Sequence, residues 1–245
     1  MIIIPMAGAS SRFTKAGFTV PKWRLPLGSR PLLDWSILSF ESVFQTEGFV
    51  FIYLDNGGAG DFLRERVEAL GIRSAAYVGL PEVTRGQAET VEVGLERAGV
   101  GAAEPITIFN IDTIRPGFSV ERSSDTDGWL ECFIGEGDHW SFVKPDPERT
   151  GRAIQVTEKI RVSEYCSTGM YYFKSAALFH DYYVRELAKP QSKELFVAPL
   201  YQRMIEDGLR VDFGVVRPEE IFFSGTPDEY ATALSMTDAV ERSFS

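Results

Sequence analysis

The sequence predicts an α/β fold, with a doubly wound, mostly parallel sheet in its first half and a mixed sheet in its second half. Over the first 115 residues, short apolar runs alternate with helical patterns, which is typical of strand–helix–strand units. Beyond that point the apolar runs are joined by turns rather than by helices, which favours a mixed sheet. With 245 residues, the chain is long enough to bury one large core.

In the first half, strands are expected at apolar runs, and helices where apolar residues recur every three or four positions. The expected strands are 2–5, 49–54, 75–78 and 106–110. The expected helices are 33–44, 62–70 and 87–98, and Gly71 is expected to cap the second of them.

In the second half, strands are expected at 129–134, 140–144, 154–158 and 168–173, with turns between them. Helices are expected at 176–187 and 195–207, followed by a strand pair at 211–216 and 221–224. A final helix should begin at Pro227, because proline suits the first turn of a helix. No linker or repeat divides the chain, so one domain is expected over 1–245, with halves 1–115 and 116–245.

The composition excludes several classes of protein. It is 44% hydrophobic and 24% charged, which is ordinary for a globular protein and unlike a disordered or low-complexity chain. No apolar run approaches the roughly 18 residues of a membrane span, and the start does not resemble a signal peptide. Cys132 and Cys166 are too few for a disulfide framework. We therefore expect a cytoplasmic protein without membrane insertion.

The charge of the chain is unevenly distributed. A net charge of −10 argues against a nucleic-acid binder. Residues 1–30 nevertheless contain no acidic side chain, and they carry Arg12, Lys15, Lys22, Arg24 and Arg30. This cluster is either a solvated face or a local site for a small, highly charged anion.

The loop AGASSRF at residues 7–13 directly follows the first expected strand, at the sheet edge where α/β proteins bind ligands. Its small residues would let backbone N–H groups approach phosphate oxygens, and Arg12 could add a bidentate contact. The loop matches neither a Walker A motif nor a dinucleotide fingerprint. A structural turn that needs small residues is an equal alternative.

Lys22 and Asp112 are the next candidates. Lys22 follows the loop and could neutralise charge on a phosphoryl group, although most lysines lie on the surface. Asp112 follows the strand at 106–110, on the same edge of the sheet as the loop. Mg²⁺ takes one or two carboxylates together with substrate phosphates, so a single aspartate there is sufficient. The alternative for Asp112 is a capping role.

Several segments together resemble a known family. The run IIIPMAGASSRF…KAGFTVPKWRLPL is followed, in order, by TRGQAETV, FNIDTI, VTEK, CSTGMYYF and GTPDEY. They are similar to the motifs of the sugar-phosphate nucleotidyltransferases (NTP transferases), above all those that serve capsule and surface-polysaccharide synthesis. The resemblance spans roughly residues 2–230 and implies a Rossmann-like fold of the GT-A nucleotidyltransferase type.

The resemblance implies a role for each matching residue. Arg12 and Lys22 would be catalytic, and Asp112 would bind Mg²⁺. The nucleotide would be held by Ala7, Gly8, Ser11, Arg12, Gly86 and Gln87, with Gln87 reading a pyrimidine edge. The acceptor would be held by Glu158, Lys159, Thr168 and Gly169.

The chain departs from the family pattern in two places. Many relatives place a second metal-binding aspartate where this chain has Phe223, and none of the nearby acids Glu219, Glu220 and Asp228 is at that position. Either Asp112 holds the metal with water and phosphates, another acid substitutes, or the site is impaired. Trp23 and Arg24, after the signature lysine, also differ from the usual small or apolar residues.

The predicted reaction transfers a nucleotidyl group from CTP, UTP or dTTP to a sugar 1-phosphate, or to a similar phosphorylated small molecule, and releases pyrophosphate. A phosphate monoester is already ionised at pH 7, so its attack needs no general base. This agrees with a chain whose only histidines, His139 and His180, lie outside the motifs. The partners would be the NTP, the phosphorylated acceptor and Mg²⁺, without nucleic acid, and a homo-oligomer stays open.

Two alternatives stay open at this point. A glycosyltransferase would use a nucleotide sugar, but such enzymes commonly carry Asp-x-Asp, whereas Asp112 is followed by Thr113 and Ile114. A non-catalytic domain that senses nucleotides or sugars would explain the missing second carboxylate.

Overall fold

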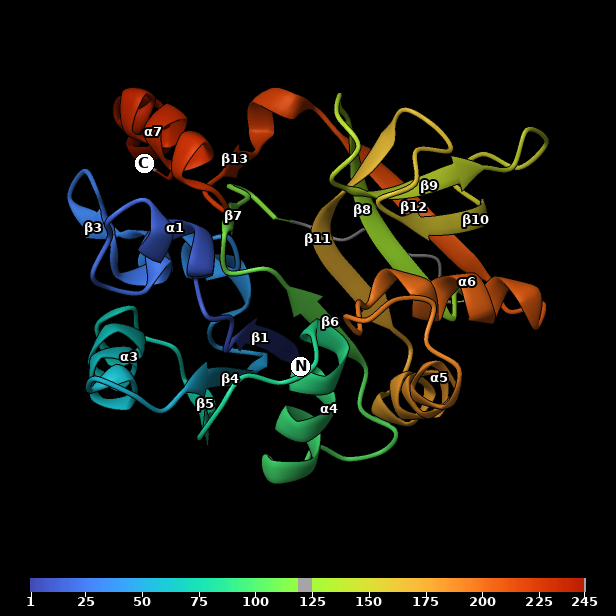
Figure 1. Cartoon of the computed structure of the whole chain (residues 1–245), viewed down its shortest axis with the longest axis horizontal. Helices are drawn as coiled ribbons and strands as arrows, with labels where there is room; N and C mark the ends of the chain where they lie inside the picture. The colour runs from blue at the N-terminus through green and yellow to red at the C-terminus, as the bar shows by residue number, and fades with distance from the viewer. Residues whose placement is uncertain (119–124, 245) are drawn as a thin grey trace.

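The computed structural model describes residues 1–118 and 125–244, and within them a nine-stranded sheet crosses the molecule (Figure 1). Its first half is parallel, in the order β6-β1-β4-β5. These strands are β1 (Ile2–Met6), β4 (Gly48–Leu54), β5 (Ser74–Leu80) and β6 (Ile106–Phe109). The predicted α/β class, with its parallel first half, is confirmed.

Helices cover both faces of the parallel strands because each strand buries side chains on both sides. In β1, Ile3 packs with Val91 of α4, whereas Ile2 and Ile4 pack on the opposite face with Leu63 of α3. Strands buried on both faces read as continuous apolar runs, which is why the sequence revealed them. The helices are α2 (Leu32–Leu38) and α3 (Ala59–Ala69) on one face, and α4 (Gln87–Arg97), α5 (Ala176–Ala188) and α6 (Ala198–Glu206) on the other.

The second half continues the same sheet. The long strand β11 (Tyr165–Phe173) pairs antiparallel with β6 and thereby joins the two halves. Around it lie β8 (Gly128–Ile134), β9 (Ser141–Pro145), β10 (Ala153–Glu158) and β12 (Val211–Val216). The pairing is antiparallel except between β12 and β8, so the predicted mixed sheet is confirmed.

Both predicted segments, 211–216 and 221–224, contain strands, but the prediction that they pair with each other is wrong. The segment 211–216 forms β12, which pairs in parallel with β8. A 3₁₀ turn, η3 (Pro218–Glu220), then carries the chain to β13 (Phe222–Phe223), which pairs with β7 (Thr113–Ile114). Because of this pairing, residues 222–225 lie beside Asp112, as the hydrogen bond from Ser224 N to Asp112 O (2.8 Å) shows.

Other differences are at element ends and in short elements. The helix expected over 33–44 ends at Leu38 and is followed by η2 (Glu41–Val43), and the helix expected from 195 begins at Ala198. The short elements are α1 (Ser11–Lys15), η1 (Lys22–Arg24), β2 (Pro26–Leu27) and β3 (Arg30–Pro31). The chain closes with α7 (Pro227–Ser235) and α8 (Thr237–Arg242), which pack back onto the first half.

Trp23 and Arg24 hold a turn in place. Trp23 is buried and packs against Phe62, with ring centroids 5.8 Å apart. The Arg24 guanidinium lies over both rings and donates to the carbonyls of Gly57 (3.1 Å) and Gly58 (2.7 Å). These residues therefore tie the segment around Lys22 to the turn after β4.

Within residues 1–118 and 125–244, no helix has the length and apolar character that a membrane crossing requires.

Candidate active site

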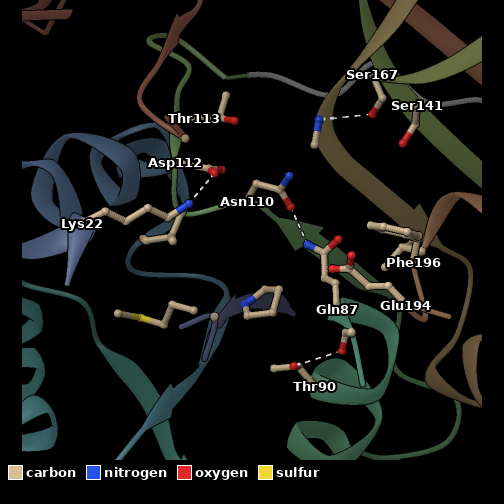
Figure 2. Close-up of a pocket in the computed structure, with 18 of the residues that line it drawn as sticks. Lys22, Gln87, Thr90, Asn110, Asp112, Thr113, Ser141, Ser167, Glu194 and Phe196 are labelled. Atoms are coloured by element: carbon tan, nitrogen blue, oxygen red, sulfur yellow. Dashed lines mark hydrogen bonds and ion pairs between the residues drawn. The ribbon is translucent and has the colours of Figure 1, made fainter. Parts of the chain in front are cut away.

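A cavity of about 560 Å³ opens at the carboxyl ends of β1 and β6, where the strand order of the parallel sheet reverses (Figure 2). Open α/β sheets bind ligands at such switch points. Its lining includes the predicted residues Ala7, Gly8, Arg12, Lys22, Gly86, Gln87, Asp112, Glu158, Lys159, Thr168 and Gly169. Ser11 begins α1 outside the lining, and Ser10 lines the cavity next to it.

The loop after β1 turns sharply at Ser10. This residue is left-handed (φ 49°), and its carbonyl accepts from Phe13 N (2.9 Å) and Thr14 N (3.1 Å), which starts α1. Its hydroxyl also accepts from Lys22 N at 3.5 Å. A Cβ at Gly8 would have nothing within 4 Å, so the loop backbone is open to the cavity. The loop and the lysine segment are thus joined, with Arg12 on the lining beside them.

Lys22 and Asp112 form an ion pair across the cavity floor. The Lys22 Nζ lies 2.5 Å from Asp112 Oδ2, and both side chains remain partly exposed. Burial favours the neutral carboxyl, but the Lys22 ammonium and its hydrogen bond outweigh that effect and hold the pKa of Asp112 below its usual range. Asp112 is therefore ionised at neutral pH and can accept a cation.

Phe223 occupies the position where many relatives are expected to carry a second acid. Its ring packs against Trp140 (centroids 4.8 Å apart) and Phe133 (5.1 Å), so this part of the wall is aromatic. No cluster of three or more His, Cys, Asp or Glu side chains suited to a metal is found among residues 1–118 and 125–244.

A second carboxylate nevertheless reaches the same space from α7. A Cβ at Gly225 would lie 2.6 Å from Asp112 Oδ2 and 3.2 Å from Glu229 Oε2, so the glycine leaves room between two carboxylates. Glu229 Oε2 also accepts from Thr226 N at 2.9 Å, which fixes the side chain at the helix start. Carboxylate oxygens suit Mg²⁺, so Asp112 and Glu229 fit such an ion.

On the nucleotide side, Gln87 is the first residue of α4 and is preceded by Gly86. A Cβ at Gly86 would lie 2.5 Å from the backbone of Leu195, so only glycine permits this close approach. The Gln87 Nε2 donates to Asn110 Oδ1 (Figure 2). Asn110 was missed by the sequence analysis, although an amide side chain at the end of a buried strand is a usable signal.

On the acceptor side, the Glu158 carboxylate accepts from Ser141 Oγ and lies 3.6 Å from Lys159 Nζ. Burial raises the pKa of Glu158, and these two partners offset part of the rise. The Lys159 Nζ also lies 4.1 Å from the ring centroid of Phe196. Ser141, Glu194 and Phe196 line this end together with His139, which the sequence analysis left unassigned.

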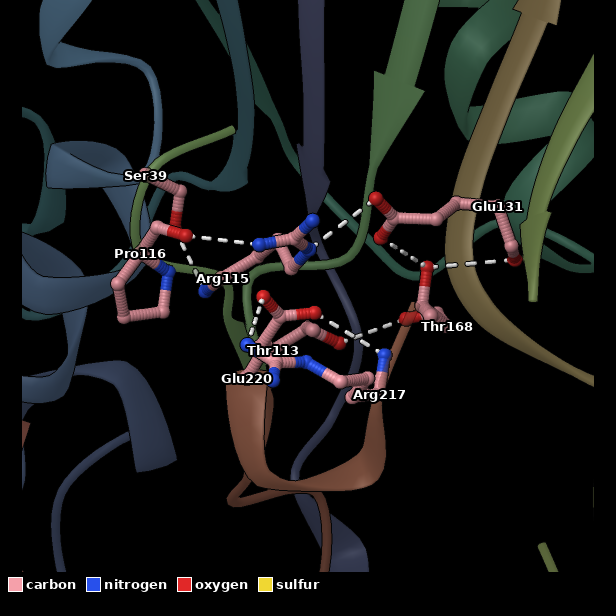
Figure 3. A network of polar contacts seen from close by, with 8 residues as sticks. All are labelled: Ser39, Thr113, Arg115, Pro116, Glu131, Thr168, Arg217 and Glu220. Atoms are coloured by element: carbon pink, nitrogen blue, oxygen red, sulfur yellow. Dashed lines mark hydrogen bonds and ion pairs between the residues drawn. The ribbon is translucent and has the colours of Figure 1, made fainter. Parts of the chain in front are cut away.

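Thr168 directs its hydroxyl away from the cavity. It donates to Glu131 Oε2 at 3.1 Å, within a buried network that also contains Arg115 (Figure 3). Gly169 follows in a left-handed conformation (φ 88°), where an added Cβ would collide with the Asn110 amide. At Thr168 and Gly169, β11 therefore contacts the cavity through its backbone.

We expect Glu131→Ala to lower the free energy of unfolding by about 3 kcal/mol, because it leaves a buried guanidinium without its partner. Arg115 Nε lies 3.1 Å from Glu131 Oε1, and the two side chains are 9% and 2% exposed. Urea denaturation of the variant measures the loss. Glu220→Ala is the control, since it breaks a pair with Arg217 (3.0 Å) whose side chains are 35% and 71% exposed, and should cost about 1 kcal/mol or less. Equal losses in the two variants would contradict the prediction.

Comparison with known proteins places this geometry among related structures. No protein-family model matches the chain, and no curated protein matches it. A nucleoside-diphosphate-sugar pyrophosphorylase from Vibrio cholerae RC9 is 41% identical, with a TM-score of 0.92, over 96% of this chain and 100% of that one.

Two more distant structures share the fold. A putative glucose-1-phosphate thymidylyltransferase from Bacillus anthracis is 18% identical, with a TM-score of 0.74, over 96% of this chain and 94% of that one. The inositol-1-phosphate CTP transferase from T. maritima is 16% identical, with a TM-score of 0.76, over 98% and 95%.

Proposed function

The chain belongs to the sugar-phosphate nucleotidyltransferase family, and we propose that it transfers a nucleotidyl group from a pyrimidine NTP to a phosphorylated small molecule. The observation that carries the proposal is the 41% identity to a nucleoside-diphosphate-sugar pyrophosphorylase over nearly the whole chain. One cavity, lined by the loop, Lys22 and Asp112 on one side and by Glu158 and Lys159 on the other, supports it. A glycosyltransferase or a sensing domain is less consistent with this relative.

In the proposed reaction, an oxygen of the acceptor phosphate forms a bond to the α-phosphorus of the NTP. The bond from that phosphorus to the β-phosphate oxygen breaks, and pyrophosphate leaves. The loop backbone at Ala7 and Gly8, with Arg12, would bind the triphosphate, and Lys22 would stabilise the charge that develops at the α-phosphate. Lys159 would orient the acceptor phosphate. No proton needs to be removed from the attacking oxygen.

We propose Mg²⁺ as the cofactor, held by Asp112 and Glu229 on either side of the space at Gly225. When bound, the ion would supply charge neutralisation and alignment of the phosphates. Phe223 packs against Trp140 and has no side-chain oxygen to offer a metal. Glu229 would therefore take the place of the missing acid.

Glu229→Gln is expected to weaken Mn²⁺ binding to the complex with a non-hydrolysable NTP by about tenfold or more, because it removes a ligand charge. The amide oxygen can still accept from Thr226 N, so the helix start is preserved. Electron paramagnetic resonance of free Mn²⁺ measures the affinity without turnover. Asp228→Asn, at the exposed neighbouring position, is the matched control and should leave the affinity unchanged. Unchanged affinity in Glu229→Gln would remove this residue from the metal site.

For the acceptor we propose a sugar 1-phosphate first and a phosphorylated polyol second. The half-buried Glu158 and the buried Ser141 offer hydrogen-bond acceptors and donors for hydroxyl groups. Residues 115–165 would carry the acceptor specificity, and part of this stretch, 119–124, lies outside the described residues. The nucleotide-binding half 1–115 and the acceptor-binding half 116–245 would act as one domain.

We propose that the protein acts in the cytoplasm, where NTPs are made, and that its role lies in the synthesis of capsule or surface-polysaccharide precursors.

A thermal-shift panel with Mg²⁺ tests the function first, followed by an assay of pyrophosphate release. A triphosphate at 100 times its Kd adds about 2.7 kcal/mol to the stability, which is a shift of several degrees. We expect selective stabilisation by one of CTP, UTP and dTTP, and release of pyrophosphate with a sugar 1-phosphate. Stabilisation by nucleotide sugars alone, without pyrophosphate release, would contradict the proposal.

A further inference from the structure

We propose that Asn110 is a positioning residue that fixes the orientation of the Gln87 amide and thereby decides which pyrimidine base the site accepts. This inference rests on the proposed function, and on the prediction that Gln87 reads the base. Asn110 directly follows β6, and Figure 2 shows it in the cavity between Gln87 and the acceptor strand. Its Oδ1 accepts from Gln87 Nε2.

The backbone of Asn110 is held from two sides. Its N–H donates to Gly169 O at 3.1 Å, and its carbonyl accepts from Thr113 N at 3.1 Å. Its side chain lies against the α-carbon of Gly169, where there is no room for a Cβ. The missing side chain of Gly169 therefore provides the space in which the Asn110 amide lies, with Nδ2 against Gly169 and Oδ1 toward Gln87.

The backbone of Gln87 is held as well. Gly86 lies against the backbone of Leu195, and Ala88 N donates to Leu195 O at 2.9 Å. The start of α4 is therefore fixed, and the freedom that remains to Gln87 is rotation of its side chain. The last torsion of a glutamine is broad and roughly two-fold, so a free amide exchanges its oxygen and nitrogen at little cost.

The orientation of the Gln87 amide matters because the pyrimidine bases differ in the order of hydrogen-bond donor and acceptor along their edge. Cytosine presents an N4–H donor beside the N3 acceptor, whereas uracil and thymine present an O4 acceptor beside an N3–H donor. An amide that makes a two-point contact with cytosine must be rotated by half a turn to make one with uracil or thymine. With Nε2 held toward Asn110, Gln87 can serve one of the two classes, and a free amide could serve both.

Binding of CTP, UTP and dTTP, measured by calorimetry with Mg²⁺, tests the inference in wild type, Asn110→Leu and Asn110→Asp. We expect the wild type to prefer one base class by about 10- to 100-fold, which is the discrimination that one good two-point contact provides. Asn110→Leu should reduce the preference to about threefold or less, since leucine accepts no hydrogen bond. In Asn110→Asp the carboxylate can only accept hydrogen bonds, so it should keep Gln87 Nε2 in place and retain the preference. Its charge would lower the affinity for all the triphosphates alike.

The matched controls are Asn56→Leu and Asn56→Asp, which make the same changes at the exposed turn after β4. They should leave the preference at the wild-type value. Should Asn110→Leu fail to fold by circular dichroism, Asn110→Ala makes the same test with a smaller side chain.

A full preference in Asn110→Leu, a lost preference in Asn110→Asp, or a wild type that binds all the bases equally would each overturn the inference. These three results leave the proposed function intact, because triphosphates still bind. A wild type that binds none of the triphosphates would instead overturn the proposed function, and the inference with it.

Discussion

Asp112→Ala is expected to abolish Mg²⁺-dependent nucleotidyl transfer, with a loss of at least about 10³-fold in kcat/KM. The residue lies in the short loop between β6 and β7, its carboxylate faces the cavity, and Lys22 holds its pKa below the usual range. A charged oxygen ligand that is already ionised needs no proton to leave before it accepts a cation. Its removal would withdraw one of the two carboxylates that fit the metal, and a lost metal costs several kcal/mol of transition-state stabilisation.

Pyrophosphate release across a titration of Mg²⁺ measures the effect of Asp112→Ala. Saturating metal should not rescue the variant, because alanine offers no oxygen to the ion. Glu229→Gln should recover part of its activity at high Mg²⁺, because Asp112 remains and the new side-chain amide oxygen can still accept a cation. Asp61→Ala, in the first turn of α3 and outside the cavity lining, is the control for loss of an acidic side chain. Activity in Asp112→Ala equal to that of this control would remove Asp112 from the metal site.

The fold could be predicted furthest where structure follows from local sequence. Strands such as β1 and β4 are buried on both faces, so their apolar runs identify them without knowledge of their partners. Strand pairing is a different question, because it depends on contacts between distant segments. The segments 211–216 and 221–224 are neighbours in sequence, yet β12 pairs with β8 and β13 with β7.

The same distinction explains which site residues could be predicted. Loop residues, Lys22 and Asp112 stand in contiguous motifs, and the structure places them around one cavity. Glu229 approaches Asp112 only because β13 pairs with β7, and no spacing in the sequence announces that approach. The direction of the Thr168 hydroxyl is equally invisible, since the buried Glu131 that accepts from it lies on another strand.

Lys22→Ala is expected to lower kcat by about 10²- to 10³-fold while the NTP still binds. A phosphate monoester attacks without a general base, so the protein contributes mainly alignment and neutralisation of charge. Removing one group that stabilises developing charge typically costs about 2.7–4 kcal/mol. Lys22 is positioned for this role by two contacts, its ion pair with Asp112 at 2.5 Å and the hydrogen bond from its N–H to Ser10 Oγ.

Steady-state kinetics together with calorimetry of NTP binding separates the two effects of Lys22→Ala. Lys15→Ala removes another cation from the same segment, outside the cavity lining, and should leave both kcat and affinity unchanged. The double variant Lys22→Ala/Asp112→Ala should lose less than the sum of the single losses, because the two side chains contact each other and act as a unit. A Lys22→Ala variant that loses nucleotide affinity but keeps kcat would show that the lysine binds the ground state. Its charge would then serve affinity, and the transition state would have to be stabilised by Arg12 and the loop backbone.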